Sequence, residues 1–420
     1  MSNFKYDVAV IGLGYVGLPL AIQATSSNLK VYGYDIDENK ISNYNLGNST
    51  IEDISDKELE ASLEKGLFLS SDPKYLSESE TIVISVPTPL TDYQPDLSYV
   101  KAAAETIAKN ITKNQIIILE STTYPGTTVE VLIPVIEEIS NLKAGVDFFV
   151  GYSPERIDTG NDTWNFKNTP KVISGINDES LSKIENFYEQ IIDSVVRVSG
   201  TKEAEMVKLL ENTYRHVNIA LINELAILCN MLEIDIWEVV NAAKTKPFGF
   251  ESFRPGPGVG GHCIPVDPNY LSFKTRQIGK PVRFVELAQE INNSMPSYVV
   301  SRLLEKMNLL EKPFKNSKIL ILGVAYKKDI GDVRESPAIG IIENLFERGV
   351  NVKYYDPFVD SILVNKKYVE KEDSFDNIDK YDLVLVHTAH TDFENFDFSK
   401  VSVPIFDATG SDHFKNAERI

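Results

Sequence analysis

The stretch VAVIGLGYVG near the start of the chain constrains the fold more than any other feature of the sequence. Gly12, Gly14 and Gly17 follow a short apolar run, and the helical run LPLAIQATSSN follows them. A second short apolar run, KVYGYD, ends at Asp35. A strand, a glycine turn, a helix and a second strand in this order predict a βαβ unit of a parallel sheet.

The same glycines predict a ligand. Gly12 permits a tight turn, Gly14 lets the backbone approach a pyrophosphate, and Gly17 permits close packing of the helix on the sheet. Asp35 lies where an acid accepts hydrogen bonds from a ribose diol and repels a 2′-phosphate. Glycines used for packing alone are the weaker alternative, because Asp35 completes the pattern. We therefore expect a dinucleotide site that prefers NAD to NADP.

Length and charge narrow the class of protein. A chain of 420 residues is expected to form two or three domains. The net charge of −19, with no basic stripe to offset it, disfavours nucleic-acid partners. No apolar run reaches the length of a membrane span, so no membrane partner is expected. The first residues lack the pattern of an export signal, and we expect a cytoplasmic protein.

The rhythm of apolar residues changes twice along the chain. Short strand patterns alternate with helices, give way to helical patterns from about residue 201, and resume at about residue 317. Residues 318–356 repeat the strand, glycine, helix, strand and aspartate order of residues 8–35. We predict two doubly wound, Rossmann-like α/β domains joined by a central helical region. The expected domains are residues 1–200, 201–312 (with the cysteine loop and a dimer interface) and 313–420.

Polar residues follow two further strands of the first domain, at the sheet edge where such folds bind ligands. The segment VPTP at 86–89 contains Thr88, and ESTTYPGT at 120–127 contains Ser121 and Thr122. We expect these side chains to line the cofactor. Ordinary turn chemistry, in which proline and threonine begin loops, explains the two segments equally well.

Three further side chains have the chemistry of a catalytic site. Glu155 in SPER suits a general base or a holder of water, although a surface Glu–Arg pair explains the motif as well. Lys208 and Asn212, four residues apart in a predicted helix, suit stabilisation of negative charge on oxygen. On spacing alone, a solvated helix face is the favoured interpretation of this pair.

The loop PGPGVGGHCIPVDP at 255–268 contains Cys263, one of only two cysteines. The adjacent His262 does not complete a zinc site, because no Cys/His cluster accompanies it. Pairing with Cys229, in an apolar helical run, is disfavoured, whereas a purely structural cysteine remains possible. A thiol combined with NAD indicates oxidation of an aldehyde, or of an alcohol through the aldehyde to the acid, because an aldehyde must first add a nucleophile before it loses hydride.

Seven segments together resemble the UDP-sugar 6-dehydrogenase family, in order and over nearly the whole chain. The resemblance implies oxidation of the C6 alcohol of a UDP-hexose to a carboxylate with two NAD, for surface polysaccharide biosynthesis. It also implies a homodimer or a higher homo-oligomer. The segments are GLGYVGLP, VPTP, ESTTYPGTT, YSPER, KLLENTYRHVNIALINE, PGPGVGGHCIPVDP and AYKKDIGDVRESP.

The resemblance assigns a role to each matching position. It implies Cys263 as the nucleophile, Lys208 and Asn212 as an oxyanion clamp, and Asp267 as the acid that pairs with Lys208 and helps to activate water. Thr122 and Glu155 are implied to hold that water and assist proton transfer. The implied NAD-binding residues are Gly12, Gly14, Tyr15, Val16, Gly17, Asp35, Pro87, Thr88, Ser121 and Thr122. The implied substrate-binding residues are Glu155, Arg156, Lys208, Asn212, His216, Arg254, Gly260, Lys327, Lys328 and Arg334, and no metal is implied.

The cysteine motif narrows the substrate. This chain reads GGHCIPVD where UDP-glucose enzymes typically read GGSCFPKD, and so it is similar to enzymes of UDP-N-acetylhexosamines. YSPERIDTGN and ESTTYPGTT look more like UDP-N-acetylglucosamine enzymes than UDP-N-acetylmannosamine ones. UDP-glucose 6-dehydrogenase is the alternative within the family. A non-catalytic nucleotide-sugar sensor and a zinc alcohol dehydrogenase are the alternatives from other classes.

Overall fold

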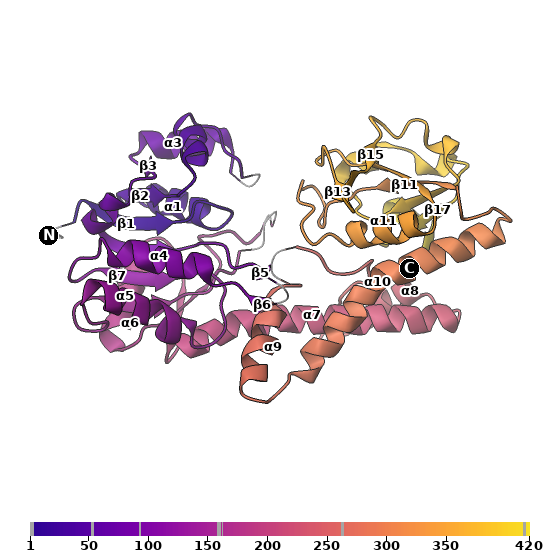
Figure 1. The fold of residues 1–420 in the computed structure, drawn as a ribbon. Coiled ribbons are helices and arrows are strands. Elements are labelled where there is room, and N and C mark those ends of the chain that lie inside the picture. The colour runs from indigo at the N-terminus through magenta and orange to yellow at the C-terminus, as the bar shows by residue number, and fades with distance from the viewer. Residues whose placement is uncertain are drawn as a thin grey trace. The chain divides into compact units, whose positions relative to one another are not determined.

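The computed structural model describes residues 4–51, 54–91, 94–157, 161, 163–261, 264–414 and 417–420. The chain divides into two units, residues 1–211 with 269–280 and residues 212–268 with 281–420. Each unit is built on a six-stranded sheet with helices packed against it (Figure 1). The predicted α/β class, with two Rossmann-like sheets and a helical region, is confirmed.

The first unit holds a parallel sheet with strand order β3-β2-β1-β4-β7-β8. Its inner strands are buried along nearly their whole length, because helices cover both faces of a doubly wound sheet. The strands are β1 (Tyr6–Ile11), β2 (Val31–Tyr34), β3 (Phe68–Ser70), β4 (Ser79–Ile84), β7 (Ile116–Leu119) and β8 (Phe149–Tyr152), beside the small pairs β5 (Leu90–Thr91) with β6 (Gln94–Pro95) and β9 (Lys171–Ile173) with β10 (Val195–Arg197).

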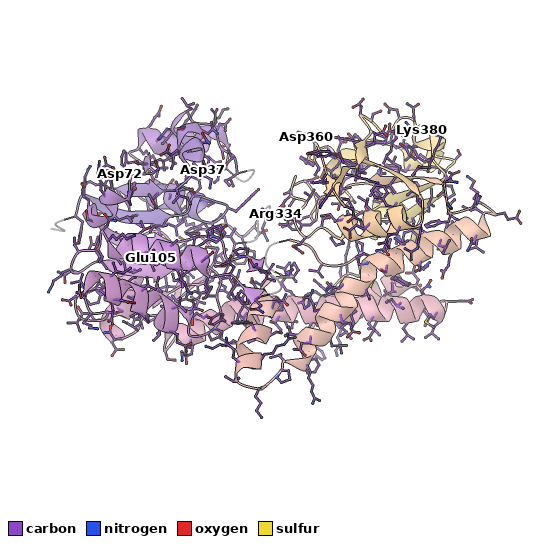
Figure 2. The ribbon with its side chains drawn as sticks, in the orientation of Figure 1. Asp37, Asp72, Glu105, Arg334, Asp360 and Lys380 are labelled. Atoms are coloured by element: carbon purple, nitrogen blue, oxygen red, sulfur yellow. The ribbon has the colours of Figure 1, made fainter. Side chains whose placement is uncertain are left out.

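The helices of this unit connect successive strands. Val8 and Val10 of β1 pack in one apolar cluster with Leu18 and Leu20 of the first helix, which fixes that helix against the sheet. Asp37, labelled in Figure 2, caps the second helix by accepting the backbone N–H groups of the second and third residues after it. The helices are α1 (Gly17–Ser26), α2 (Glu38–Asn45), α3 (Asp56–Glu64), α4 (Ser98–Ala108), α5 (Ile133–Ser140) and α6 (Asp178–Tyr188), with α9 (Asp267–Gln277) contributing its residues from 269 onward.

The second unit holds a parallel sheet with strand order β15-β12-β11-β16-β17-β18. Its strands are β11 (Lys318–Leu322), β12 (Asn351–Tyr355), β15 (Glu370–Lys371), β16 (Leu383–Val386), β17 (Ile405–Asp407) and β18 (Glu418–Arg419), beside the hairpin β13 (Leu363–Val364) with β14 (Lys367–Tyr368). Its helices are α8 (Ile236–Ala243), α10 (Arg283–Leu309) and α11 (Pro337–Glu347). Pro296 lies inside α10.

The two sheets repeat one another in detail. Gly12 and Gly323 each follow the first strand and donate their N–H to the last residue of the second strand, at 2.9 and 2.8 Å. Asp35 and Asp356 each follow the second strand and accept the N–H of the residue after that glycine, at 2.9 and 2.7 Å. The internal repeat predicted from the sequence is confirmed.

The long helix α7 (Thr201–Met231) contains the boundary between the two units, which falls after residue 211. The helix begins where the helical rhythm is predicted to begin, at about residue 201, and it carries several of the predicted site residues.

Candidate active site

In the turn between β1 and α1, Gly12 and Gly17 are tightly packed, whereas Gly14 adjoins open space. Gly12 has φ +89°, and a Cβ on it would lie 2.4 Å from the carbonyl oxygen of Ser85. A Cβ on Gly17 would lie 1.8 Å from the carbonyl oxygen of Gly12, whereas one on Gly14 would meet no atom of the described residues within 4 Å. The fold therefore requires Gly12 and Gly17, whereas Gly14 adjoins open space just before α1, which is where the predicted pyrophosphate would lie.

Asp35 lies at the end of β2 as predicted and is almost fully buried. One carboxylate oxygen accepts the N–H of Leu13 at 2.9 Å, and the other accepts the N–H of Asp37 at 3.0 Å. Lys40, which the sequence analysis did not identify, places its ammonium 2.8 Å from Asp35. The positive charge of Lys40 partly offsets the repulsion between Asp35 and a 2′-phosphate. The expected preference for NAD over NADP depends on that repulsion.

The loops after β4 and β7 are tied together by Ser121. Its hydroxyl donates to the carbonyl oxygen of Val86 at 2.8 Å and accepts the N–H of Val86 at 2.9 Å. The donor of Ser121 is therefore used within the protein. Tyr270 of α9 donates its hydroxyl to the carbonyl oxygen of Thr88 at 2.9 Å, which anchors α9 to the same pair of loops. Pro87 stays exposed between these contacts.

Thr123, the residue after the predicted Thr122, was not predicted from the sequence. Its side chain is fully buried, and its hydroxyl has no hydrogen-bond partner among the described residues. The predicted Thr122 is only half-buried. A buried hydroxyl without a partner is costly unless it meets a water or a ligand, so Thr123 is better placed than Thr122 to hold one. The sequence does not separate two adjacent threonines.

Glu155 lies in a buried cluster of charges behind the loop after β8. Its carboxylate accepts the backbone N–H groups of the two following residues at 2.7 and 2.6 Å, and the ammonium of Lys171 at 2.9 Å. Lys171 also contacts Glu120 at 2.9 Å, and Tyr188 donates its hydroxyl to Glu120. Neither Lys171 nor Glu120 was predicted, because their spacing in the sequence shows no pattern.

The pKa values of the two acids in this cluster are shifted in opposite directions. Burial by itself raises the pKa of Glu155, but the charge of Lys171, with that of Lys208, outweighs burial and holds the pKa below its usual value. Burial raises the pKa of Glu120 more than Lys171 lowers it. An acid with a lowered pKa and three hydrogen bonds is a poor general base, so Glu155 suits an anchoring role better than the predicted proton transfer.

Lys208 and Arg156 both fasten the loop that carries Glu155. The buried ammonium of Lys208 donates to the main-chain carbonyl oxygen of Glu155 at 2.6 Å. Arg156 donates to the carbonyl oxygen of Pro170 at 2.6 Å and forms an ion pair with Glu211 at 2.7 Å. Arg156, predicted as a substrate contact, is thus engaged within the protein, whereas an ammonium has three donors and Lys208 retains capacity for a ligand.

Asn212 and Asp267 meet in the second unit. Both side chains are buried, and the Asn212 amide donates to the carboxylate of Asp267. Asp267 is the first residue of α9, directly after the glycine-rich loop. The predicted solvated helix face is therefore wrong for Asn212, whose amide has a second N–H group of the kind that an oxyanion site needs.

His216 begins a buried polar chain that reaches the glycine-rich loop. Asn292 of α10 donates to the carbonyl oxygen of His216 at 3.2 Å and accepts from Asn223 at 3.0 Å, and Asn223 accepts the N–H of Gly256 at 2.9 Å. Burial lowers the pKa of His216 to about 4, so the ring is neutral at pH 7. The structure thus buries His216, predicted as a substrate contact, in the support of the loop.

The predicted nucleophile Cys263 and its neighbour His262 lie outside the described residues. The glycines before them pack on the loop after β11, where a Cβ on Gly260 would lie 2.7 Å from the Cβ of Tyr326 and one on Gly261 would lie 2.8 Å from the Tyr326 ring. Close packing against Tyr326 therefore accounts for Gly260 and Gly261, whereas a Cβ on Gly258 would meet Pro337 at 3.2 Å. The other cysteine, Cys229, is partly buried against the apolar core of its unit.

The predicted basic residues near the C-terminal sheet form exposed ion pairs. Lys328 contacts Glu394 at 2.9 Å, and Arg334, labelled in Figure 2, makes two hydrogen bonds to Asp332 at 2.9 and 2.7 Å. Exposed pairs of this kind contribute little free energy, so an anionic ligand can replace the partners. Of the other two predicted basic residues, Lys327 is half-buried and Arg254 is exposed.

No helix in the described part of the chain is long and apolar enough to cross a membrane. No group of three His, Cys, Asp or Glu side chains in that part is arranged to hold a metal ion.

Family models match the chain in three consecutive stretches. Residues 6–192 match the NAD binding domain of the UDP-glucose/GDP-mannose dehydrogenase family, residues 202–294 match its central domain, and residues 320–410 match its UDP binding domain.

Individual relatives match over nearly their whole length. A UDP-N-acetyl-D-glucosamine 6-dehydrogenase of Pseudomonas aeruginosa is 37% identical over 397 residues, which cover 94% of this chain and 92% of that protein. Protein CapL of Staphylococcus aureus is also 37% identical, over 92% of this chain and 90% of that protein. The solved structure of a UDP-D-ManNAc dehydrogenase from Pyrococcus horikoshii has a TM-score of 0.88 at 32% identity and covers 98% of this chain and 96% of that one.

Proposed function

The chain belongs to the UDP-glucose/GDP-mannose dehydrogenase family of oxidoreductases, and on this premise we propose that it oxidises C6 of a UDP-N-acetylhexosamine to the carboxylate with NAD. The preferred substrate in this proposal is UDP-N-acetylglucosamine, and the acid sugar serves surface polysaccharide biosynthesis. The similarity to UDP-N-acetylglucosamine and UDP-N-acetylmannosamine enzymes over more than nine-tenths of the chain carries the proposal. We also propose the domain division at residues 200 and 312.

The proposed reaction removes four electrons in two steps. The C6 alcohol would lose a hydride and a proton to give the aldehyde, which would add the thiol of Cys263. The thiohemiacetal would lose a second hydride and a proton to give a thioester, and two molecules of NAD, one after the other, would take up the two hydrides. Water then cleaves the thioester and releases the acid and the thiol. The space at Gly14 and the carboxylate of Asp35 would hold the pyrophosphate and the ribose of the cofactor.

Polar side chains supply the remaining roles in this proposal. The ammonium of Lys208 and the amide of Asn212 stabilise negative charge on the C6 oxygen, and Asp267 orients that amide. The unpartnered hydroxyl of Thr123 binds the hydrolytic water, in place of the predicted Thr122. Exposed basic groups beside the C-terminal sheet meet the charge of the UDP moiety.

NADH production with a panel of UDP-sugars tests the proposal. We expect two NADH per molecule of UDP-N-acetylglucosamine and lower kcat/KM with UDP-glucose, UDP-N-acetylgalactosamine and UDP-N-acetylmannosamine. The Cys263→Ser variant should lose formation of the acid, because a hydroxyl is far less nucleophilic than a thiolate. Acid formation at the normal rate in this variant would contradict the covalent step.

The panel also separates the alternatives. Preference for UDP-glucose would favour a UDP-glucose 6-dehydrogenase, and a different acetylated sugar would correct the substrate within the proposed class. An absence of NADH with every UDP-sugar would favour the nucleotide-sugar sensor. Loss of turnover on removal of bound zinc would favour a zinc alcohol dehydrogenase.

A further inference from the structure

Lys171 of β9 lies between two buried acids, Glu120 and Glu155. It is almost fully buried, and its ammonium lies 2.9 Å from Glu120 and 2.9 Å from Glu155. The second oxygen of Glu120 has no hydrogen-bond partner among the described residues. Burying a lysine and two carboxylates is costly, and apolar side chains of similar volume would often serve stability as well or better.

A chain of contacts leads from this cluster to the oxyanion site. Lys171 holds one carboxylate oxygen of Glu155, and the other oxygen accepts the next two backbone N–H groups, so the loop is folded around its own side chain. That fold aims the main-chain carbonyl oxygen of Glu155 at the ammonium of Lys208, 2.6 Å away. The position of the Lys208 charge thus depends on an ionised Glu155.

We propose that Lys171 is a positioning residue for the oxidation: by holding Glu155 as a carboxylate, it fixes the place of the Lys208 ammonium. This inference rests on the proposed function. The groups that face Glu155 are Lys171 from β9, Lys208 from α7, Glu120 from the loop after β7 and Tyr188 from α6. Lys171 is the cation that contacts the Glu155 carboxylate in this set, so its removal changes both the charge and the shape of the loop.

The test compares Lys171→Met with the wild type. We expect kcat for the UDP-sugar to fall about 100-fold, because a small displacement of a catalytic group has an effect of this size. The KM for NAD should change less than about twofold, since the glycine turn is not altered. The acidic limb of the kcat profile should move to higher pH, because removal of the Lys171 charge raises the pKa of Glu155.

A matched control lies in the second unit. Lys353 of β12 also bridges two acids, Glu370 and Glu372, at the surface of the C-terminal sheet. Lys353→Met removes a lysine from the same arrangement without approaching the proposed site. We expect this variant to retain the wild-type kcat and pH profile.

Two further variants keep the test decisive if Lys171→Met fails to fold. Lys171→Arg retains the charge and should keep most of kcat. Lys171→Met combined with Glu120→Gln removes one acid together with the cation, and it should lose kcat as the single variant does. Suppose that a variant without Lys171 folds, binds NAD and keeps the wild-type kcat and acidic limb. This result would overturn the inference about Lys171 and leave the proposed function intact. No turnover by the wild-type protein would reject the proposed function and the inference with it.

Discussion

The three glycines of the turn between β1 and α1 are present for two different physical reasons. Gly12 and Gly17 lack a side chain because a Cβ would overlap the carbonyl oxygens of Ser85 and Gly12, respectively. Gly14 meets no such obstacle among the described residues. A glycine that the protein does not need for packing leaves room for something else, and in this fold a pyrophosphate is the expected occupant.

Alanine substitutions separate these two causes. Gly17→Ala should lower the free energy of unfolding by about 1–3 kcal/mol, because α1 must move away from β1. Gly14→Ala should leave that free energy within about 0.5 kcal/mol of the wild type but weaken NAD binding at least about tenfold. Denaturant unfolding and calorimetric titration with NAD measure the two quantities. Unchanged NAD affinity in Gly14→Ala would contradict the assignment of the space to the cofactor.

At the scale of an element, α7 has an apolar stripe that its own unit does not cover. Leu221, Leu225 and Leu228 are exposed, and Leu232 continues the stripe just past the end of the helix. Spacings of four, three and four residues place these side chains on one side of the helix. An exposed apolar stripe is typical of a protein interface, and we propose that a second copy of this chain covers it in a homodimer.

The stripe predicts an effect of charge on assembly. Leu221→Glu combined with Leu228→Glu should raise the dissociation constant of the dimer at least about 100-fold, because each protomer would bury two charges in the interface. Leu46→Glu, at an isolated exposed leucine after α2, is the control and should leave assembly unchanged. Sedimentation velocity measures the result, and a monomeric wild-type protein would contradict the proposed interface.

At the scale of the whole molecule, two buried histidines make stability depend on pH. Burial lowers the pKa of His216 and of His387 to about 4. The unfolded chain takes up these protons near pH 6.5, whereas the folded chain does so only near pH 4. The full stability is therefore present above pH 6.5 and is lost as pH falls toward 4, by up to about 3 kcal/mol for each histidine.

Urea unfolding at pH 7 and pH 5 tests this prediction in the wild type and in His387→Gln. The variant should lose less stability between the two values, because one of the protonations is removed. Glu120, Glu205 and Asp407, whose pKa values burial raises, act in the opposite direction, so the difference between the two proteins is the informative quantity. Equal losses in both proteins would contradict the role of His387.

The sequence by itself determined the two Rossmann-like sheets, the helical region between them and the place of the glycine turn with Asp35. These features follow from local causes, since the apolar rhythm of a buried strand or helix and the conformational freedom of glycine are written in neighbouring residues. The same local signals predicted that Lys208 and Asn212 lie one helix turn apart. They did not show that Asn212 is buried against Asp267 and not solvated.

Only the tertiary structure decided which polar groups are partners. It brought Lys171 and Glu120 to Glu155 from separate strands, assigned the hydroxyl of Ser121 to Val86, and left that of Thr123 without a partner. These outcomes depend on contacts between residues far apart in the chain, where burial sets both the ionisation and the cost of an unpaired group. No spacing in the sequence records such contacts, because the sheet edge that creates them exists only after the strands have assembled.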